Sequence, residues 1–356
     1  MGKLLIYWLV AKVPDVAKIY VLARKDPQKE GICVEDRLSE ILASPPFDSL
    51  RAKISNFEQE MAQKIIIVKA NLMEKGLGLE SNAKQKLIEE VQILIHAAAS
   101  SDWQESLQTS FRCNVVASLE LMELAHQMLK LCVFLHVSSA FFMGRPLDSK
   151  IEERVYPLPF DAEMMYKKLC DCPADKMDKE WTKLQPIFHT THSFTKALIE
   201  VLLDNRRQNI PLAIIRPTIL GATYREPFPG WVDSLNVIGV LFIYTALGIV
   251  QILPGRLDYT LDIVPCDYVV HAIFSIIFQL KSNSSKDDGE FGPASQVPIF
   301  FISSSSNPLT WKFAIGTMQK YWQSTLPAKP QGSPKISVYR NYLFYQEIVE
   351  THLSAN

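Results

Sequence analysis

A chain of 356 residues and 40.4 kDa is long enough for one large domain or two ordinary ones. Hydrophobic residues make up 48% and charged residues 21%, a globular balance that excludes wholesale disorder. The chain has 37 Lys and Arg residues and 38 Asp and Glu residues, so it has no excess of positive charge to neutralise a phosphate backbone. We therefore expect no nucleic-acid partner. Six cysteines are too few for a disulfide scaffold in a chain of this length, which favours a reduced interior.

Short apolar runs alternate with segments of helical spacing along most of the chain. The runs that predict strands are residues 19–23, 65–69, 93–97, 133–137 and 212–216. Helical spacing covers residues 4–13, 34–43, 83–90, 115–131 and 193–205. Unbroken apolar strands separated by helices indicate a parallel sheet covered on both faces. We therefore predict an α/β fold with a doubly wound, Rossmann-like sheet.

The start of the chain departs from this plan. In a doubly wound fold the first strand leads into a glycine-rich turn that opens the first helix. Residues 4–13 are typical of that helix, and only Gly2 is placed to be the last glycine of the turn. We therefore expect a sheet without its usual first strand and glycine-rich turn, with the adjoining strands short of pairing partners. The same pattern leads us to expect a chain that is N-terminally incomplete.

Later segments indicate insertions and a second region. We predict one dinucleotide-binding domain over residues 1–280, with substrate-side segments at about 145–190 and 222–262, and a partly irregular C-terminal segment over 281–356. Residues 282–298 predict a polar loop, 300–302 a late strand, and 326–337 irregular chain. Residues 237–250 carry no charge but fall short of the roughly 20 residues that span a bilayer. They favour a buried or interfacial helix over a membrane span.

Two positions suggest contacts with a dinucleotide. Arg24 follows the first predicted strand, where an arginine accommodates a ribose 2′-phosphate and an acid binds the 2′-hydroxyl. Asp26 lies close by, and a solvated basic turn would look the same, but we favour the phosphorylated cofactor. Ala98 belongs to a run of small residues that ends the strand at 93–97, where adenosine could lie against the backbone. Tight strand–helix packing explains the same run equally well.

Polar residues at later element ends suggest a reacting centre. Asn114 opens a predicted helix, where an asparagine is most often a cap. Ser139 belongs to a serine pair after strand 133–137, at the end of a parallel strand where ligands bind. His192 and Lys196 are four residues apart on a predicted helix and can point at one spot. An imidazole beside an ammonium is a possible acid and its helper, although each signal is weak alone.

The combination resembles the extended short-chain dehydrogenase/reductases, in which a Ser or Thr after the strand and a Tyr-x-x-x-Lys helix act on a carbonyl. The string RPTILGATYREPFPGWVDSLN, residues 216–236, narrows the resemblance to the alcohol-forming fatty acyl-coenzyme A reductases. The similarity extends from about residue 2 to about residue 280. Further segments that agree are PDVAKIYVLAR, HAAAS, KLCVFLHVSSAF, FTKALIE and DIVPCDYVV.

The resemblance implies an activity and a setting. Such enzymes use NADPH to reduce a long-chain fatty acyl-CoA, first to an aldehyde through a hemithioacetal and then to a primary alcohol. Family members are often membrane-associated, at the endoplasmic reticulum or the peroxisome, so we expect an intracellular protein with possible membrane association. The sequence indicates no metal site and no oligomeric state.

The resemblance also implies roles for single residues. Ser139 would hydrogen-bond the developing oxyanion, and Lys196 would bind the nicotinamide ribose and lower the pKa of the proton donor. Asn114 would hold a supporting water molecule. Arg24 would meet the 2′-phosphate, and Pro217 to Ile219 would line the nicotinamide face.

The sequence departs from the family pattern at three places. The proton donor of the family is a tyrosine, and His192 stands at its position. The family's Gly-Asp pair beside adenine is replaced by Ala70 and Asn71, which removes a carboxylate there. The glycine-rich turn that cradles the pyrophosphate is missing. These departures leave an alternative open, a catalytically impaired or truncated member that only binds acyl-CoA or a partner.

Overall fold

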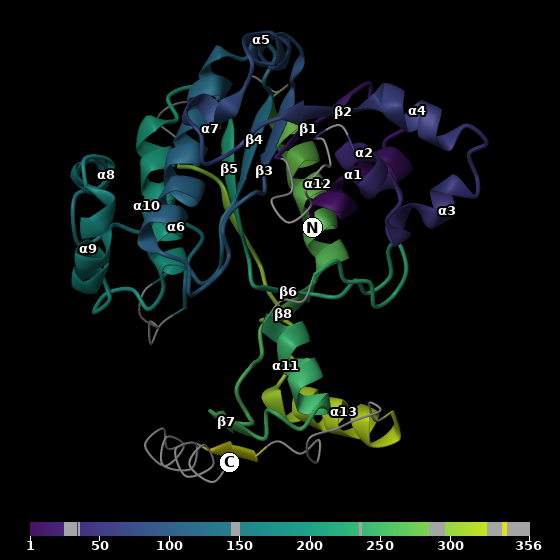
Figure 1. Cartoon of the computed structure of the whole chain (residues 1–356), viewed down its shortest axis with the longest axis vertical. Helices are drawn as coiled ribbons and strands as arrows, with labels where there is room; N and C mark the ends of the chain where they lie inside the picture. Colours follow the sequence, from purple (N-terminus) through teal and green to yellow (C-terminus); the bar gives the residue numbers. More distant parts are fainter. Residues whose placement is uncertain are drawn as a thin grey trace. The chain divides into compact units, whose positions relative to one another are not determined.

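The computed structural model describes residues 1–24, 34, 36–143, 150–234, 237–284, 296–325 and 337–339. The chain divides into two compact units (Figure 1). The first unit comprises Met1–Pro217 and Asp267–Ile302, and the second comprises Thr218–Cys266 and Ser303–Asn356. The domain predicted over residues 1–280 includes parts of both units, and its boundary at 280 stays a prediction.

The first unit is built on a parallel sheet of four strands, in the order β3-β4-β5-β9. The strands are β3 (Ile93–His96), β4 (Val133–Val137), β5 (Leu212–Pro217) and β9 (Ile299–Ile302). All residues of β4 and β5 are buried, as expected for central strands covered on both faces. The predicted parallel α/β sheet is confirmed, and β4 has the predicted bounds.

Two further strands form a separate parallel pair, β1 (Ile19–Ala23) with β2 (Ile65–Lys69). Among the described residues no strand pairs with the second edge of β1 or with the second edge of β3. One side-chain hydrogen bond connects β1 to the segment that leads into β3. Tyr20 of β1 donates to the carboxylate of Glu90, the last residue of α5, at 2.8 Å. The expectation that a first strand is missing between these edges stays a prediction.

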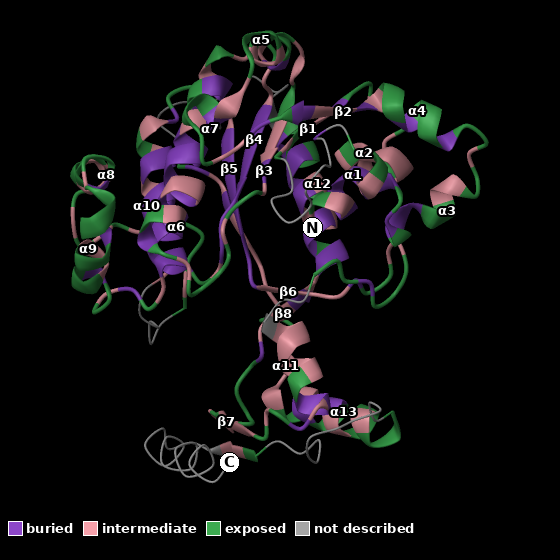
Figure 2. Ribbon diagram, in the orientation of Figure 1, coloured by how far each residue is buried: buried purple, intermediate pink, exposed green. Residues whose placement is uncertain are grey.

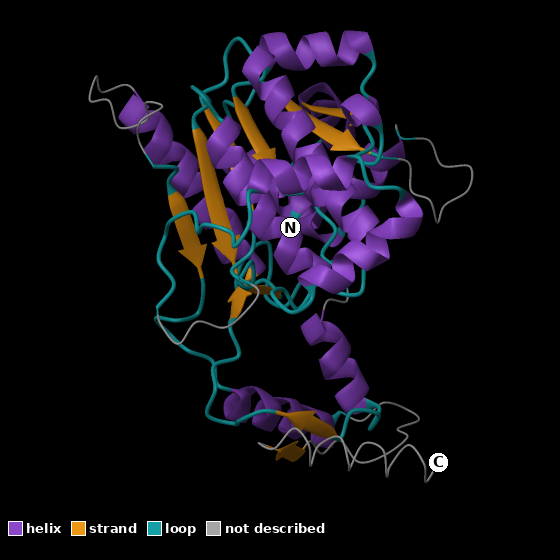
Figure 3. Cartoon of the chain, turned by 90° about the vertical axis from the view of Figure 1, so that its left-hand side faces the viewer, coloured by secondary structure: helices purple, strands orange, loops and turns teal. Residues whose placement is uncertain are grey.

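Helices cover both sides of the four-stranded sheet, with α7 and α10 on one side and α1 and α12 on the other (Figure 1). The view in Figure 3 shows the strands side by side, partly behind helices. The helices of this unit are α1 (Gly2–Lys12), α2 (Asp36–Leu42), α3 (Asp48–Arg51), α4 (Phe57–Lys64), α5 (Ser81–Glu90), α6 (Leu107–Phe111), α7 (Ala117–Gln127), α8 (Ala162–Cys170), α9 (Met177–Leu184), α10 (Thr191–Arg206) and nearly all of α12 (Cys266–Ser284). This two-sided cover makes the sheet doubly wound, as predicted.

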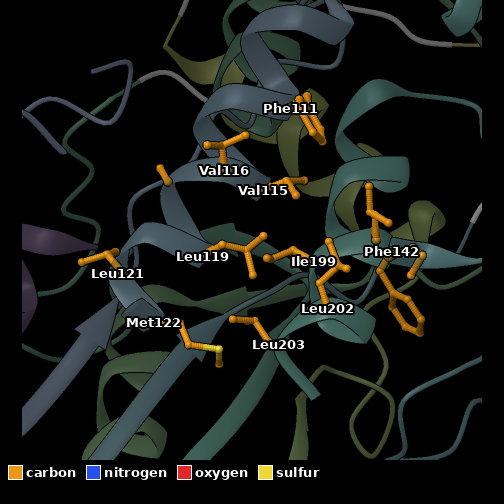
Figure 4. Packing of buried hydrophobic residues seen from close by; sticks show 14 of the residues in the cluster. Phe111, Val115, Val116, Leu119, Leu121, Met122, Phe142, Ile199, Leu202 and Leu203 are labelled. Atoms are coloured by element: carbon orange, nitrogen blue, oxygen red, sulfur yellow. The ribbon is translucent and has the colours of Figure 1, made fainter. Parts of the chain in front are cut away.

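The main core lies between the sheet and helices α7 and α10. Leu119 and Met122 of α7 meet Ile199, Leu202 and Leu203 of α10 (Figure 4). Buried residues gather on the strands and on the helix sides that face them (Figure 2). Each fully buried aliphatic side chain contributes roughly 1.5–3 kcal/mol, so this layer holds α10 firmly against β4 and β5.

A second core forms around β1 and β2 with the helices before and after them. Its buried members include Tyr7 of α1, Ile65 of β2 and Phe57 of α4. Trp8 of α1 stacks on Phe274 of α12, with ring centroids 4.1 Å apart. The helix predicted over 4–13 is thus present as α1, and its four consecutive residues Leu4 to Tyr7 are all buried, as in a helix that is apolar on most sides.

The second unit has short strands, the apolar helix α11 and the amphipathic helix α13. Strand β6 (Ile219–Gly221) pairs in parallel with β8 (Ile263–Pro265), and β7 (Ile252–Pro254) with β10 (Ser337–Tyr339). Helix α11 (Val237–Ala246) packs on α13 (Trp311–Ser324), where the rings of Phe242 and Trp322 lie 4.8 Å apart. Within the described ranges, no helix is long and apolar enough to cross a membrane.

Several predictions for the loops need correction or lie outside the described residues. The polar loop predicted from residue 282 is wrong in its first part, because α12 continues to Ser284. Residues 285–295 of that loop and residues 326–336 lie outside the described part. The segment predicted at about 145–190 contains α8 and α9, and its described residues hold no strand, as expected. Residues 237–250 form a helix only as far as Ala246.

Candidate active site

Helix α10 positions the His192 and Lys196 pair. A capping box fixes its start: Thr190 Oγ1 accepts from the Ser193 N–H at 3.1 Å, and the Thr190 N–H points back to Ser193 Oγ at 3.4 Å. His192 then lies in the first turn and Lys196 one turn later, on the same helix face. Both side chains are buried, at 8% and 3% exposure.

Lys196 reaches across to the sheet. Its Nζ donates to the carbonyl of Val137, the last residue of β4, at 2.9 Å. Burial lowers the pKa of Lys196 to about 8, against the opposing effect of the Glu200 carboxylate one turn further. Glu200 in turn forms a fully buried ion pair with Arg216 of β5, with Nη2 and Oε2 2.6 Å apart. Lys196 therefore stays mostly charged at pH 7, but it loses a proton more easily than an exposed lysine does.

Ser139 lies two residues beyond the strand end that Lys196 contacts. Its Oγ accepts from the N–H of Phe141 at 3.1 Å, which leaves the hydroxyl proton available to donate. The side chain is 8% exposed. The structure thus brings Ser139 and Lys196 to one end of the parallel sheet, the carboxyl end where ligands bind in this architecture.

His192 is held through its Nδ1. That atom lies 3.1 Å from the carbonyl oxygen of Ser100, and because a carbonyl only accepts, Nδ1 carries the proton. Burial, and then the charge of Lys196, lower the pKa of His192 to about 4. At neutral pH the ring is therefore neutral, and its Nε2 is an acceptor rather than a donor.

Asn114 is not the helix cap that its sequence position suggests. It lies inside a π-helical turn, Arg112–Val116, and it is 1% exposed. Its Oδ1 accepts from the Ser100 N–H at 2.8 Å, and its Nδ2 donates to the Ser100 carbonyl at 3.1 Å and to Thr195 Oγ1 at 3.0 Å. The cap prediction is wrong because the helix has already begun, and π-turns are frequent at functional sites. Asn114 and His192 meet at Ser100.

Three predicted cofactor residues lie where they could meet a ligand. Arg24 is exposed directly after β1, and Ala98 is exposed just past the end of β3. Gly2 is the first residue of α1, whose N-terminus has no side-chain cap. Nothing lies within 4 Å of a Cβ built on Gly2, so no close approach within the chain requires glycine there.

Three others have different surroundings. Asn71 is occupied by a local turn, accepting from the Met73 N–H at 3.1 Å and donating to Glu74 at 2.8 Å. Pro217 ends β5, and its carbonyl accepts from Ala140 at 2.9 Å, beside Ser139. Ile219 belongs to the second unit, in β6.

Sequence reasoning missed the groups that support the pair. Ser100 forms hydrogen bonds with both His192 and Asn114. The ion pair of Glu200 and Arg216 lies one helical turn after Lys196. His96 and His136 were also missed, although each stands inside an otherwise apolar strand run, which is the signal that could have found them. In the described part of the chain no cluster of three or more metal-ligating side chains occurs.

The chain is similar to a known protein family and to curated proteins. The model of the male sterility protein family of NAD-binding domains matches residues 1–273. Fatty acyl-CoA reductase 1 of Gallus gallus is 32% identical over 351 residues, and that of Homo sapiens is 31% identical over 350 residues. Each alignment covers 97% of this chain and 64% of the relative. The chain therefore spans just under two thirds of the length of these relatives.

Solved structures agree on the fold. The terminal R domain of the myxalamid biosynthetic pathway matches with a TM-score of 0.64 at 17% identity, over 98% of this chain and 71% of that one. The reductase domain of a nonribosomal peptide synthetase from Mycobacterium tuberculosis matches with a TM-score of 0.61 at 16% identity, over 100% and 74%. At these identities the likeness extends to the fold alone.

Proposed function

Because the chain belongs to the male sterility protein family of NAD-binding domains, we propose that it is a fatty acyl-CoA reductase that uses NADPH. The proposed reaction reduces a long-chain fatty acyl-CoA to an aldehyde and then to a primary alcohol. The curated relatives that carry this name support the substrate class. A location at the endoplasmic reticulum or peroxisome membrane belongs to the same proposal.

The contact between Lys196 and the end of β4 carries the proposal. Lys196 Nζ bonds to Val137 at 2.9 Å, two residues before Ser139, so an ammonium and a hydroxyl flank one end of the sheet. Ser139 can donate its hydroxyl proton to the thioester or aldehyde oxygen as negative charge builds there. Lys196 supplies a positive charge beside that position and can hold the hydroxyls of a ribose.

His192 limits the proton transfer in this proposal. A tyrosine at its position would present a phenol with a reference pKa near 10, which is a donor at neutral pH. His192 instead binds Ser100 through its only proton, and its pKa of about 4 leaves little imidazolium at pH 7. Absence of a positioned acid typically costs about 10²–10⁴ in rate. We therefore expect slow turnover.

The residues present fit a nicotinamide dinucleotide in part. The uncapped N-terminus of α1 offers N–H groups to a phosphate, and Arg24 offers a cation to a 2′-phosphate. Ala98 leaves room for a ribose at the end of β3. NADPH supplies the hydride when it is bound.

The test is NADPH oxidation by the purified chain with palmitoyl-CoA. We expect His192→Tyr to raise the rate at least about tenfold, because it restores a neutral-pH proton donor. His189→Tyr is the matched control, since His189 is exposed and three residues away, and we expect it to change nothing.

A flat NADPH signal in the His192→Tyr variant would defeat the reductase proposal. Calorimetry with palmitoyl-CoA then identifies what remains. Heat of binding without turnover would mean that the chain only binds acyl-CoA, and no heat would remove this ligand class altogether.

A further inference from the structure

A group of polar side chains lies buried beside Lys196, where the surrounding strands are apolar. His96 of β3 and His136 of β4 are register partners, and their ring centroids lie 5.2 Å apart. They are 4% and 1% exposed. Two buried histidines on adjacent strands are costly unless their ring nitrogens find hydrogen-bond partners.

The protein itself satisfies His96. Its Nε2 lies 2.8 Å from Ser118 Oγ, and this hydroxyl donates its own proton to the Asn114 carbonyl at 2.7 Å. A hydroxyl has one proton, so Ser118 must accept from His96, and His96 carries its proton on Nε2. These two hydrogen bonds connect His96 of β3, through Ser118, to the backbone of Asn114 in the π-helical turn.

His136 and Ser138 have no such arrangement. Both ring nitrogens of His136 and the hydroxyl of Ser138 are buried and find no hydrogen-bond partner in the described part of the chain. His136 and Ser138 are two residues apart in extended chain, so their side chains lie on the same face. Burial and the charge of Lys196 hold the pKa of His136 well below its usual range. Its ring is therefore neutral, with one donor and one acceptor nitrogen.

Lys196 adjoins the same place. Its Nζ bonds to Val137, the residue between His136 and Ser138, and this one acceptor uses one of three ammonium protons. The charge of Lys196 acts on both histidines. The unsatisfied polar groups of His136 and Ser138 therefore flank the residue whose carbonyl binds the buried Lys196 ammonium.

We propose that His136, Ser138 and Lys196 form a buried binding site for ordered water. The two ring nitrogens of His136 point in diverging directions, so two water molecules are needed. One accepts from the histidine N–H and the other donates to the unprotonated nitrogen, and the ammonium of Lys196 and the hydroxyl of Ser138 are further hydrogen-bond partners for them. A buried water normally makes two to four such bonds to otherwise unsatisfied groups. A metal cation does not suit the site, since the ammonium would repel it.

The site has a consequence for Lys196. Water that accepts from the ammonium further stabilises its charged form, which opposes the lowering of the Lys196 pKa by burial. It also places an exchangeable proton between Lys196 and His136. This consequence does not depend on the substrate of the enzyme.

Nitrogen NMR of isotope-labelled histidine tests the site in the unaltered protein. The His136 signals are assigned as those lost in His136→Gln. We expect both ring nitrogens to show hydrogen-bonded shifts. The shift of an unbonded acceptor nitrogen would overturn the proposal, because it would mean that the group is dry.

Two substitutions test the energetics. If water is bound, His136→Phe and Ser138→Ala each remove a water partner, and we expect the melting temperature to fall by a few degrees. If no water is bound at His136 and Ser138, we expect the opposite result. Each substitution would then remove an unsatisfied polar atom and raise the melting temperature. A rise in both variants would overturn the proposal. His189→Phe, at an exposed position, serves as the control.

Discussion

The chemistry of the candidate site depends on single buried residues whose ordinary titration is suppressed. His96, His136 and His192 all have pKa values below the usual range, first because of burial and then because of the charge of Lys196. An unfolded chain exposes the same imidazoles to water, where their pKa is near 6.5. The unfolded state therefore binds more protons than the folded state in mildly acidic solution.

This difference predicts a pH-dependent stability. The stabilisation is complete above about pH 6.5 and is lost as the pH falls toward the folded pKa of His192, about 4. For each histidine that stays neutral in the folded state, the unfolding free energy should fall with a slope of about 0.7 kcal/mol per pH unit at pH 6.5, rising toward about 1.4 kcal/mol per pH unit near pH 5. Urea unfolding between about pH 6.5 and 5 measures the slope, a range chosen to limit carboxylate protonation. His192→Gln should reduce it, whereas His189→Gln should not.

Arg24 carries the prediction about cofactor choice. It is exposed at the end of β1, so its replacement should leave the fold intact. We expect Arg24→Ala to weaken NADPH binding at least about tenfold and to leave NADH binding nearly unchanged, because only NADPH carries the 2′-phosphate. Calorimetry with both dinucleotides measures the ratio. Lys53→Ala, another exposed cation, is the control, and an equal loss for both dinucleotides would contradict the role.

At the scale of elements, α10 connects sequence to site. Its capping box sets the first turn, and its apolar face packs on α7 and β4, so the positions of His192 and Lys196 follow from the packing of the whole helix. The spacing of these two residues predicted a shared face. It could not predict that the Ser100 carbonyl would accept a hydrogen bond from His192 Nδ1, because that contact joins segments 92 residues apart in the sequence.

The cap can be tested directly. Thr190→Ala removes the hydroxyl that accepts from Ser193, and we expect the unfolding free energy to fall by about 1 kcal/mol. The pKa of His192 should also rise toward its usual value if the first turn frays and admits water. Thermal unfolding and histidine NMR measure the two effects. Thr182→Ala, which removes an exposed hydroxyl within α9, should change neither the stability by this amount nor the His192 signal.

At the scale of the whole molecule, the described strands of the first unit form two separate parallel sheets. β1 with β2 and the set from β3 to β9 are each internally paired. Packing of α1 against β1, β2 and α12 supports the smaller pair. The second unit contains the apolar helix α11, and we predict that a long acyl chain contacts this helix.

Helix α11 carries a prediction about chain length. Leu241 is partly buried in this helix, and a charge there should weaken the binding of long acyl chains, since each buried methylene contributes about 0.8 kcal/mol. We expect Leu241→Asp to weaken palmitoyl-CoA binding at least about tenfold and butyryl-CoA binding less than about twofold. Ile249→Asp is the matched control, since Ile249 is exposed beyond the end of the helix. Equal losses for both ligands would contradict an acyl-chain contact.

The sequence by itself determined the elements and the family. Strands β1, β2 and β4 have the predicted bounds, because short apolar runs between turn residues have few other ways to bury their side chains. The resemblance to fatty acyl-coenzyme A reductases also needed only the residues themselves. Tertiary structure decided the state of the site, including the proton on His192, the π-turn at Asn114 and the unsatisfied polar group at His136. Each of these depends on burial and on partners from distant segments, which no local pattern encodes.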